Sequence, residues 1–347
     1  MTKKERMKGI ESLSKNLDKQ FETSNTFQRR GSLVRKPVPH IPTNLEQFDR
    51  EVLGCGGWPR GRIIEIFGPE AGGKTAITLH SIGELQKAGG VAAFVDAEHA
   101  LDPTFASNLG VDMDELFISQ PDCGEEALTI VESLVEGSLV DIVVVDSVTA
   151  LVPRAELAGE MGDSCMGLQA RLMSQACRKL TGLCSKKDVT VIFINQIREK
   201  IGVVFGNPET TTGGRALKFY SSVRVEVRRV AASKGGTLKE GENVVGHKVM
   251  LKNVKNKVAM PYKDCVVDLR YQTGFDKPEA MIDYALKIGV LTGSAWYVIK
   301  GLDEKYRREG IPMGQLRIAI DTYHQELQAK QEAYEKAIEE AKAVAEG

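Results

Sequence analysis

The sequence predicts an α/β fold with a mostly parallel, twisted sheet that is covered by helices on both faces. Between about residues 60 and 230, short runs of β-branched and aromatic residues alternate with segments of helix length. Strands that are apolar along their whole length are typical of a parallel sheet buried on both faces. The 347 residues suffice for about two domains, and 42% hydrophobic and 27% charged residues are typical of a globular protein.

The strands and helices of this sheet are expected to follow one another along the chain. The expected strands are 63–67, 91–95, 141–146, 189–195 and 223–227, and the expected helices are 74–88, 124–137 and 167–186. Two further strand-like runs, 247–254 and 264–271, flank an Asn/Lys turn and predict an antiparallel extension of the sheet. Glycines punctuate 231–246, which we therefore expect to form a loop or a hairpin.

Smaller parts are expected at both ends of the chain. Apolar residues at helical spacing predict an amphipathic helix over 3–21, and the three prolines within 37–42 then favour an extended arm over 22–42. The composition changes near residue 276, and 321–345 again has helical periodicity. The predicted domains are 1–42 (helix and arm), 43–273 (core) and 274–347 (small α+β domain ending in an acidic helix).

Charge and composition exclude several classes of protein. The 46 basic and 47 acidic residues give a net charge of −1, so any nucleic-acid surface must be local. No apolar run is long enough to span a membrane, and the start of the chain lacks the apolar stretch of a secretory signal. The six cysteines form no C-x-x-C pair, which argues against a zinc ribbon or a redox dithiol and favours a cytoplasmic protein with reduced thiols.

The run GPEAGGKT at 68–75 fits the phosphate-loop pattern G-x-x-x-x-G-K-[ST] between an expected strand and an expected helix. The glycines let backbone N–H groups converge on phosphate oxygens, and the helix directs its positive end at the same anion. We expect Lys74 to hold the β- and γ-phosphates and Thr75 to ligate Mg²⁺. The nucleotide-binding residues predicted here are Gly68, Pro69, Glu70, Ala71, Gly72, Gly73, Lys74, Thr75 and Ala76.

Polar residues at the ends of other apolar strands predict the rest of an ATP site. Asp146 follows the strand 141–146 and suits Mg²⁺ held through water, the alternative being an Asp that caps the next turn. Beyond the strand 91–95, Asp96, Glu98 and Asp102 are all candidates for activating a water, and periodicity does not choose among them. Gln196 ends the strand 189–195 and is expected to sense the γ-phosphate.

Two long segments, 153–167 and 197–216, are rich in glycine and polar residues and carry apolar residues that look exposed. Loops of this length are uncommon unless they are functional, although ordinary surface connections are the alternative. Basic side chains would neutralise DNA phosphates, and an apolar side chain can enter between bases. The predicted DNA-binding residues are Met166, Arg171, Arg178, Arg198, Lys200, Gly213, Gly214 and Arg215.

Several long runs, among them GPEAGGKT, VVDSVTALVPRAELAGEMGDS, FINQIREKIGV and FGNPETTTGGRALKFYSSVR, closely resemble the bacterial-type RecA recombinases, bacterial or phage-encoded. The resemblance covers about 60–270 in continuous order. It implies a RecA-like P-loop NTPase core and an N-terminal arm that adds to a neighbour's sheet. It also implies a helical homo-polymer on single-stranded DNA that hydrolyses ATP when DNA is bound, exchanges strands with double-stranded DNA and acts in DNA repair and the SOS response.

The resemblance also implies roles for individual residues. Glu98 becomes the catalytic carboxylate and Gln196 the nucleotide sensor, while Lys255 and Lys257 reach the ATP of a neighbouring protomer. Asp102 and Phe105 fall in the nucleotide site, and Phe219 at a position that couples neighbours. The two DNA-binding loops correspond to 158–166 and 197–211. This sequence has Phe105 and Cys165 where the family commonly has Tyr and His, and its segment 231–243 is longer than usual.

Two other functions fit the same nucleotide fold. A ring-forming, helicase-like DNA motor would use the same phosphate loop but would close into hexamers. A regulator without catalytic activity is disfavoured because Lys74, Glu98 and Asp146 are all present. Single-strand-binding and loading proteins are further candidate partners, and no membrane partner is expected.

Overall fold

The computed structural model describes residues 1–21, 37–160, 165, 167–199, 206 and 208–345. The chain divides into two compact units, Met1–Val38 and Pro39–Gly347. In the first unit, helix α1 (Lys3–Gln20) begins at a capping box in which the side chains of Thr2 and Glu5 each accept the other's backbone N–H. None of its residues is buried, so the apolar face predicted from the sequence is exposed within this unit.

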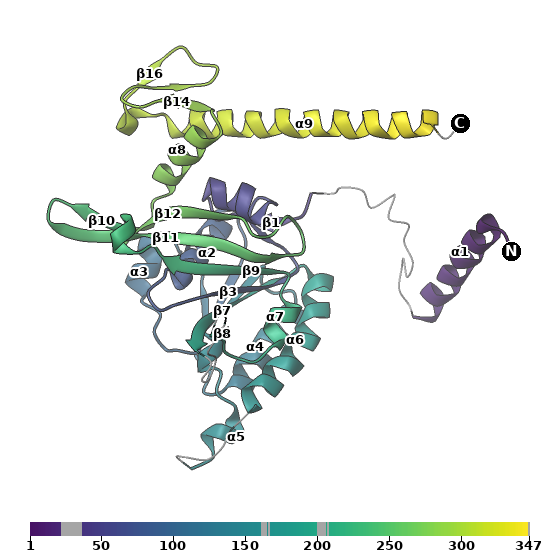
Figure 1. Ribbon diagram of the computed structural model, residues 1–347. Coiled ribbons are helices and arrows are strands. Elements are labelled where there is room, and N and C mark those ends of the chain that lie inside the picture. The colour runs from purple at the N-terminus through teal and green to yellow at the C-terminus, as the bar shows by residue number, and fades with distance from the viewer. Residues whose placement is uncertain (22–36, 161–164, 166, 200–205, 207, 346–347) are drawn as a thin grey trace. The chain divides into compact units, whose positions relative to one another are not determined.

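An eleven-stranded sheet forms the centre of the second unit (Figure 1). Its order is β13-β12-β11-β9-β3-β7-β6-β4-β5, with β10 beside β11 and β8 beside β7. The neighbours from β9 through β3, β7, β6 and β4 to β5 are parallel. The pairs β7–β8, β9–β11, β10–β11, β11–β12 and β12–β13 are antiparallel. The strands are β3 (Ile63–Gly68), β4 (Ala92–Asp96), β5 (Phe117–Ser119), β6 (Ile142–Asp146), β7 (Thr190–Glu199), β8 (Glu209–Thr211), β9 (Val223–Arg229), β10 (Thr237–Glu240), β11 (Asn243–Asn256), β12 (Asp264–Arg270) and β13 (Gly274–Phe275).

Helices cover both faces of this sheet, as the uniformly apolar strands predicted. Successive residues of a strand point to opposite faces, and in β6 Val144 joins the core cluster packed by helix α2 while Val143 and Val145 join the cluster packed by α4 and α6. The helices are α2 (Lys74–Lys87), α3 (Pro103–Asn108), α4 (Gly124–Glu136), α5 (Arg154–Leu157), α6 (Leu168–Lys187) and α7 (Ala216–Tyr220). The predicted α/β fold with a mostly parallel sheet is confirmed.

Several boundaries differ from the expectation. Strand β7 continues past residue 195 to Glu199 because it pairs with β8, which places Ile197 opposite Thr211. The segment 231–246 contains β10, which forms a hairpin with β11. The short elements β5, α3 and α7 were not predicted. A small two-stranded sheet of β1 (His40–Ile41) and β2 (Trp58–Pro59) and the π-helical segment Phe48–Leu53 precede β3.

The C-terminal part has a core of its own. Helix α8 (Lys277–Lys287) packs with a three-stranded antiparallel sheet, β14 (Leu291–Gly293), β15 (Tyr297–Ile299) and β16 (Lys305–Tyr306), and with the start of helix α9 (Met313–Ala345). The final helix therefore begins at Met313 rather than at 321. Arg50 pairs with Asp321, and Arg317 with Glu46 at 3.2 Å, so both ion pairs join α9 to the segment before β2. In the described part of the chain, no helix is long and apolar enough to cross a membrane.

Candidate nucleotide-binding site and nucleic-acid interface

The loop between β3 and α2 closes around the side chain of Lys74. Lys74 is only 9% exposed, and its Nζ donates to the carbonyl oxygens of Gly68 at 3.1 Å and Pro69 at 2.6 Å. Gly73 has φ of 96°, and a Cβ at this position would lie 3.0 Å from Leu269 Cδ2. Glycine therefore meets both the conformation and the close approach that the loop requires.

A pocket of about 470 Å³ opens beside this loop. That volume is within the range of small-molecule sites, roughly 300–1,000 Å³. One wall is the loop itself, and the other is formed by side chains from α3 and from the antiparallel strands or their ends. The lining residues are Ala71, Gly72, Gly73, Lys74, Thr75 and Ala76, and opposite them Phe105, Arg229, His247, Leu269, Arg270 and Tyr271. Of this second group, the sequence pointed only to Phe105.

Thr75, in the first turn of α2, and Asp146, at the end of β6, are in contact. The hydroxyl of Thr75 donates to Asp146 Oδ2 at 2.6 Å. Burial raises the pKa of Asp146 to about 6, and burial lowers the pKa of Lys74. A hydroxyl beside a carboxylate is the donor set with which phosphate loops hold Mg²⁺, so these two residues fit the expected ion.

The structure separates the three acidic candidates near β4. Asp96 accepts the backbone N–H groups of Ala100 and Leu101, each at 3.2 Å, and Asp102 caps helix α3 by accepting the N–H of Thr104 at 2.8 Å. Glu98, in contrast, is exposed, and one of its oxygens accepts hydrogen bonds from two side chains.

One of these donors to Glu98 directly follows β6, and the other lies on β7. Ser147 Oγ, directly after β6, donates to Glu98 Oε1, and Gln196 Nε2 on β7 donates to the same oxygen at 3.0 Å. The structure therefore brings the predicted carboxylate and the predicted sensor into direct contact. Ser147 was not singled out from the sequence, although its place after a buried strand next to Asp146 was a usable signal.

A buried polar network lies directly behind the sensor. Asn195 Nδ2 donates to Glu65 Oε1 at 2.9 Å and to the carbonyl oxygen of Thr212 at 3.2 Å, while Thr212 Oγ1 donates to Asn195 Oδ1 at 2.6 Å. Glu65 is also paired with Arg224. These contacts tie the segment after β8 to the core strands. The sequence offered one hint, a polar Asn inside the apolar run FIN.

Comparisons with known proteins give the family. The RecA N-terminal domain family matches residues 8–276. The chain is 56% identical over 295 residues to Protein RecA of Symbiobacterium thermophilum, covering 84% of this chain and 83% of that protein. It is 51% identical over 323 residues to Protein RecA of Macrococcus caseolyticus, covering 93% and 87%. It is 53% identical over 298 residues to Protein RecA of Clavibacter michiganensis subsp. michiganensis, covering 86% and 80%.

The chain belongs to the RecA family. The resemblance inferred from the sequence is therefore confirmed, and the ring-forming motor is not favoured. The RecA match includes the whole pocket, the Glu98–Gln196 contact and the two lysines at the end of β11.

All four arginines predicted to bind DNA in this RecA-family chain are exposed. Arg171 and Arg178 lie on α6, Arg198 lies on β7 and Arg215 precedes α7. Among the residues that the structure describes, Arg171, Arg178 and Arg215 form no ion pair, so their charges are available to phosphates. Met166 and Lys200 lie outside the described residues, as do parts of both predicted loops.

The tandem glycines at the end of the second predicted DNA loop pack tightly on the core. Gly213 and Gly214 have φ of 75° and 77°. A Cβ would lie 2.9 Å from Val148 Cγ1 at Gly213 and 2.7 Å from Ala170 Cβ at Gly214. The backbone N–H of Gly213 donates to Gln169 Oε1 at 3.2 Å. The turn therefore fixes this end of the loop against the start of α6.

Lys255 and Lys257 converge on the end of helix α7. Lys255 Nζ donates to the carbonyl oxygens of Lys218 at 2.6 Å and Phe219 at 2.8 Å, and Lys257 Nζ donates to that of Phe219 at 3.4 Å. Burial, with a further contribution from Lys257, lowers the pKa of Lys255 to about 8. The side chain of Phe219 is 69% exposed. Neither lysine is among the described residues that line the nucleotide pocket of the same chain.

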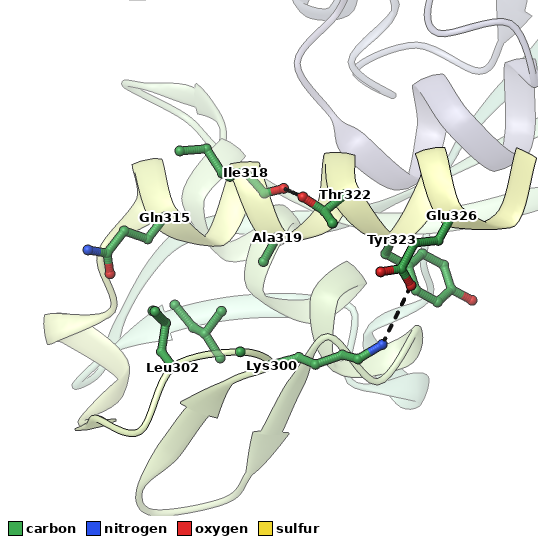
Figure 2. Close-up of a pocket in the computed structure, with 10 residues that line it drawn as sticks. Lys300, Leu302, Gln315, Ile318, Ala319, Thr322, Tyr323 and Glu326 are labelled. Atoms are coloured by element: carbon green, nitrogen blue, oxygen red, sulfur yellow. Dashed lines mark hydrogen bonds and ion pairs between the residues drawn. The ribbon is translucent and has the colours of Figure 1, made fainter. Parts of the chain in front are cut away.

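A second pocket, of about 360 Å³, lies in the C-terminal part between α9 and the segment after β15 (Figure 2). Two of its polar contacts lie within the protein. Lys300 pairs with Glu326 at 3.9 Å, and Thr322 Oγ1 donates to the carbonyl oxygen of Ile318 at 2.9 Å. It contains no phosphate loop and is not the nucleotide site.

Proposed function

We propose that the chain is an ATP-dependent recombinase that polymerises on single-stranded DNA and catalyses homologous pairing and strand exchange with double-stranded DNA. One observation carries this proposal: Gln196 bonds to Glu98 at the phosphate loop and lies on the strand that continues into the second predicted DNA loop. ATP chemistry and DNA binding would thus share one strand. The six free cysteines are compatible with action in the cytoplasm.

The pocket would hold ATP with its phosphates on the loop and its base toward Phe105. Backbone N–H groups of the loop and the start of α2 would bind the phosphates, and Lys74 would exchange its carbonyl partners for phosphate oxygens. Thr75 and Asp146 would hold Mg²⁺, which when bound neutralises charge on the phosphates.

Glu98 would act as the general base that orients the attacking water and accepts its proton. Its carboxylate is exposed. Ser147 and Gln196 both donate to its Oε1, so neither of them occupies the second oxygen. A positioned carboxylate of this kind contributes about a hundredfold to ten-thousandfold to a rate.

Gln196 would couple the nucleotide to the DNA loop. While it bonds to Glu98 it is held in one position, and a γ-phosphate within its reach would offer a competing partner. Because β7 runs on as a paired strand to Glu199, a change at Gln196 would be passed to the residues that follow.

Self-association would complete the site. Lys255 and Lys257 would reach the γ-phosphate of a neighbouring chain, with Phe219 packed at the same seam, and such a head-to-tail contact builds an open helix. The exposed apolar face of α1 supports contact with another copy, and residues 22–36 of the predicted arm 22–42 lie outside the described residues. We also propose that the chain divides into three domains, 1–42, 43–273 and 274–347, as the sequence predicts.

The decisive experiment measures ATP hydrolysis with and without single-stranded DNA, alongside strand exchange between homologous molecules and electron microscopy. We expect DNA-stimulated hydrolysis, exchanged strands and open helical filaments. Closed hexamers without strand exchange would instead identify a motor.

The matched variants for this experiment are Lys74→Ala and Lys87→Ala, at the two ends of α2. Removing the buried Lys74 ammonium should weaken ATP binding by at least about a hundredfold and abolish filaments, because charged hydrogen bonds to phosphate are lost. Lys87, on the solvent side of α2, should be replaceable without either effect. Normal filaments from Lys74→Ala would refute the assignment of the site.

A further inference from the structure

The imidazole of His247 is buried in the nucleotide pocket without a partner. His247 lines the pocket and is 3% exposed, yet neither Nδ1 nor Nε2 has a hydrogen-bond partner among the residues that the structure describes. Buried polar side chains in proteins are nearly always hydrogen-bonded. Two unsatisfied ring nitrogens beside a ligand-sized space therefore point to a bound molecule as their partner.

The sheet register places His247 on the pocket wall that faces the phosphate loop. His247 pairs with Leu269 across the β11–β12 ladder, and Val249 lies two residues further along the same face. A Cβ on Gly73 would contact both Leu269 and Val249, so the phosphate loop rests on this face. His247 lies one two-residue step, about 7 Å, from Val249 and directly across the ladder from Leu269, so it lines the pocket beside the loop.

The neighbours of His247 suit a nucleoside. The ring of Tyr271 lies 5.6 Å from that of His247, and Phe105 belongs to the same pocket. Burial and, secondarily, the charge of Arg229 lower the pKa of His247, so its ring is neutral at physiological pH. A neutral imidazole has one N–H donor and one acceptor nitrogen. That pair matches a base edge or a ribose hydroxyl, whereas phosphates require donors alone.

We propose that His247 is a specificity-determining residue that hydrogen-bonds the nucleoside of the bound nucleotide. The inference rests on the proposed function, because it takes the pocket to hold ATP. The inference depends on the position of His247 in the β11 ladder. It assigns no role to the segment 231–243.

The test compares His247→Leu, which removes both polar atoms, with His247→Gln, whose amide keeps a donor and an acceptor. Equilibrium affinities without DNA are measured by competition against a fluorescent nucleotide. The panel is ATP and three analogues that lack one nucleoside group each: 2′-deoxy-ATP, 7-deaza-ATP and purine riboside triphosphate. We expect His247→Leu to weaken ATP binding roughly three- to tenfold, as one lost hydrogen bond predicts, and His247→Gln to restore most of it.

The analogues identify the partner group. One of them should bind the unaltered chain several-fold more weakly than ATP but show no additional loss with His247→Leu, because its missing group is the partner of the histidine. His40→Leu, which removes an imidazole from β1 outside the pocket, is the control and should leave all affinities unchanged.

The outcomes separate the two proposals. If the unaltered chain binds ATP and His247→Leu binds every nucleotide equally well, the role of His247 is refuted while the ATP site stands. If the unaltered chain does not bind ATP, the proposed function itself fails. Should the leucine variant not fold, the unaltered chain alone decides: equal affinities for ATP and all three analogues would overturn the inference.

Discussion

Glu98 has one oxygen held by two donors, and this arrangement makes a specific prediction at the scale of a single residue. Glu98→Gln keeps an oxygen that can accept from Ser147 and Gln196 but removes the group that takes a proton. We expect ATP affinity within about threefold of the unaltered chain and turnover reduced by about a hundredfold or more, with filaments that persist after ATP is added. Nucleotide affinity, steady-state hydrolysis and filament lifetime provide the three measurements.

The contact between α2 and β13 makes a prediction at the scale of elements. His80 Nε2 on α2 accepts the backbone N–H of Phe275 at 2.8 Å. Burial, followed by the charge of Lys277, lowers the pKa of His80 to about 3. Between the ordinary histidine pKa and that value, the unfolded chain binds a proton that the folded chain does not, so the stability from this site is present at neutral pH and lost on acidification.

At pH 5 this histidine should reduce the free energy of unfolding by about 2 kcal/mol relative to pH 7. Urea unfolding at both pH values, with His80→Gln as the matched variant, measures the effect. The glutamine can accept from Phe275 and does not titrate, so its loss of stability between the two pH values should be smaller by that amount. Equal losses for both chains would show that His80 does not carry this acid sensitivity.

Elements with a strong local signal were predictable. Strands β3, β6 and β7 each contain a run of mostly apolar residues because both of their faces are buried there, and the phosphate loop is one contiguous motif. Strand β5 was missed because it is short and lies at the sheet edge, where Phe117 is 65% exposed. Strand β8 exists only through its pairing with the end of β7, which no local pattern encodes.

The same distinction holds within the site. Lys74, Thr75 and Asp146 occur where a strand ends in a recognisable motif, so the sequence pointed to them. Arg229, His247 and Tyr271 enter the pocket through the antiparallel register of β9, β11 and β12, which places residues distant in sequence side by side. Long-range register is set by tertiary packing, and residue types alone did not single out these three positions.

The position of Lys255 outside the pocket of its own chain makes a prediction for the whole assembly. If each ATP site takes Glu98 from one copy and Lys255 from the next, mixing Glu98→Gln with Lys255→Ala should restore hydrolysis that neither variant has alone. In an equal mixture with random order, about a quarter of the seams combine an intact Glu98 with an intact Lys255.

The mixing experiment measures ATP hydrolysis while the ratio of Glu98→Gln to Lys255→Ala is varied. Activity should peak at equal amounts and vanish toward either pure variant. A mixture of Lys255→Ala with Lys257→Ala is the internal control, because both substitutions affect the same side of the seam, so every seam lacks one of the two lysines and mixing should restore nothing. Activity no higher than the average of the separate variants would place both groups in one chain.

The extension of β7 to Glu199 has one more consequence. A hydrogen-bonded ladder is stiff along its length, so β7 would move as one piece from Gln196 to Glu199, at the start of the second predicted DNA loop. A stiff strand transmits a displacement from one end to the other. The affinity for DNA and the hydrolysis state of the bound ATP would therefore have to change together. A substitution that makes β7 more flexible, such as Ile197→Gly, would leave a chain that still hydrolyses ATP but whose affinity for DNA no longer depends on the bound nucleotide.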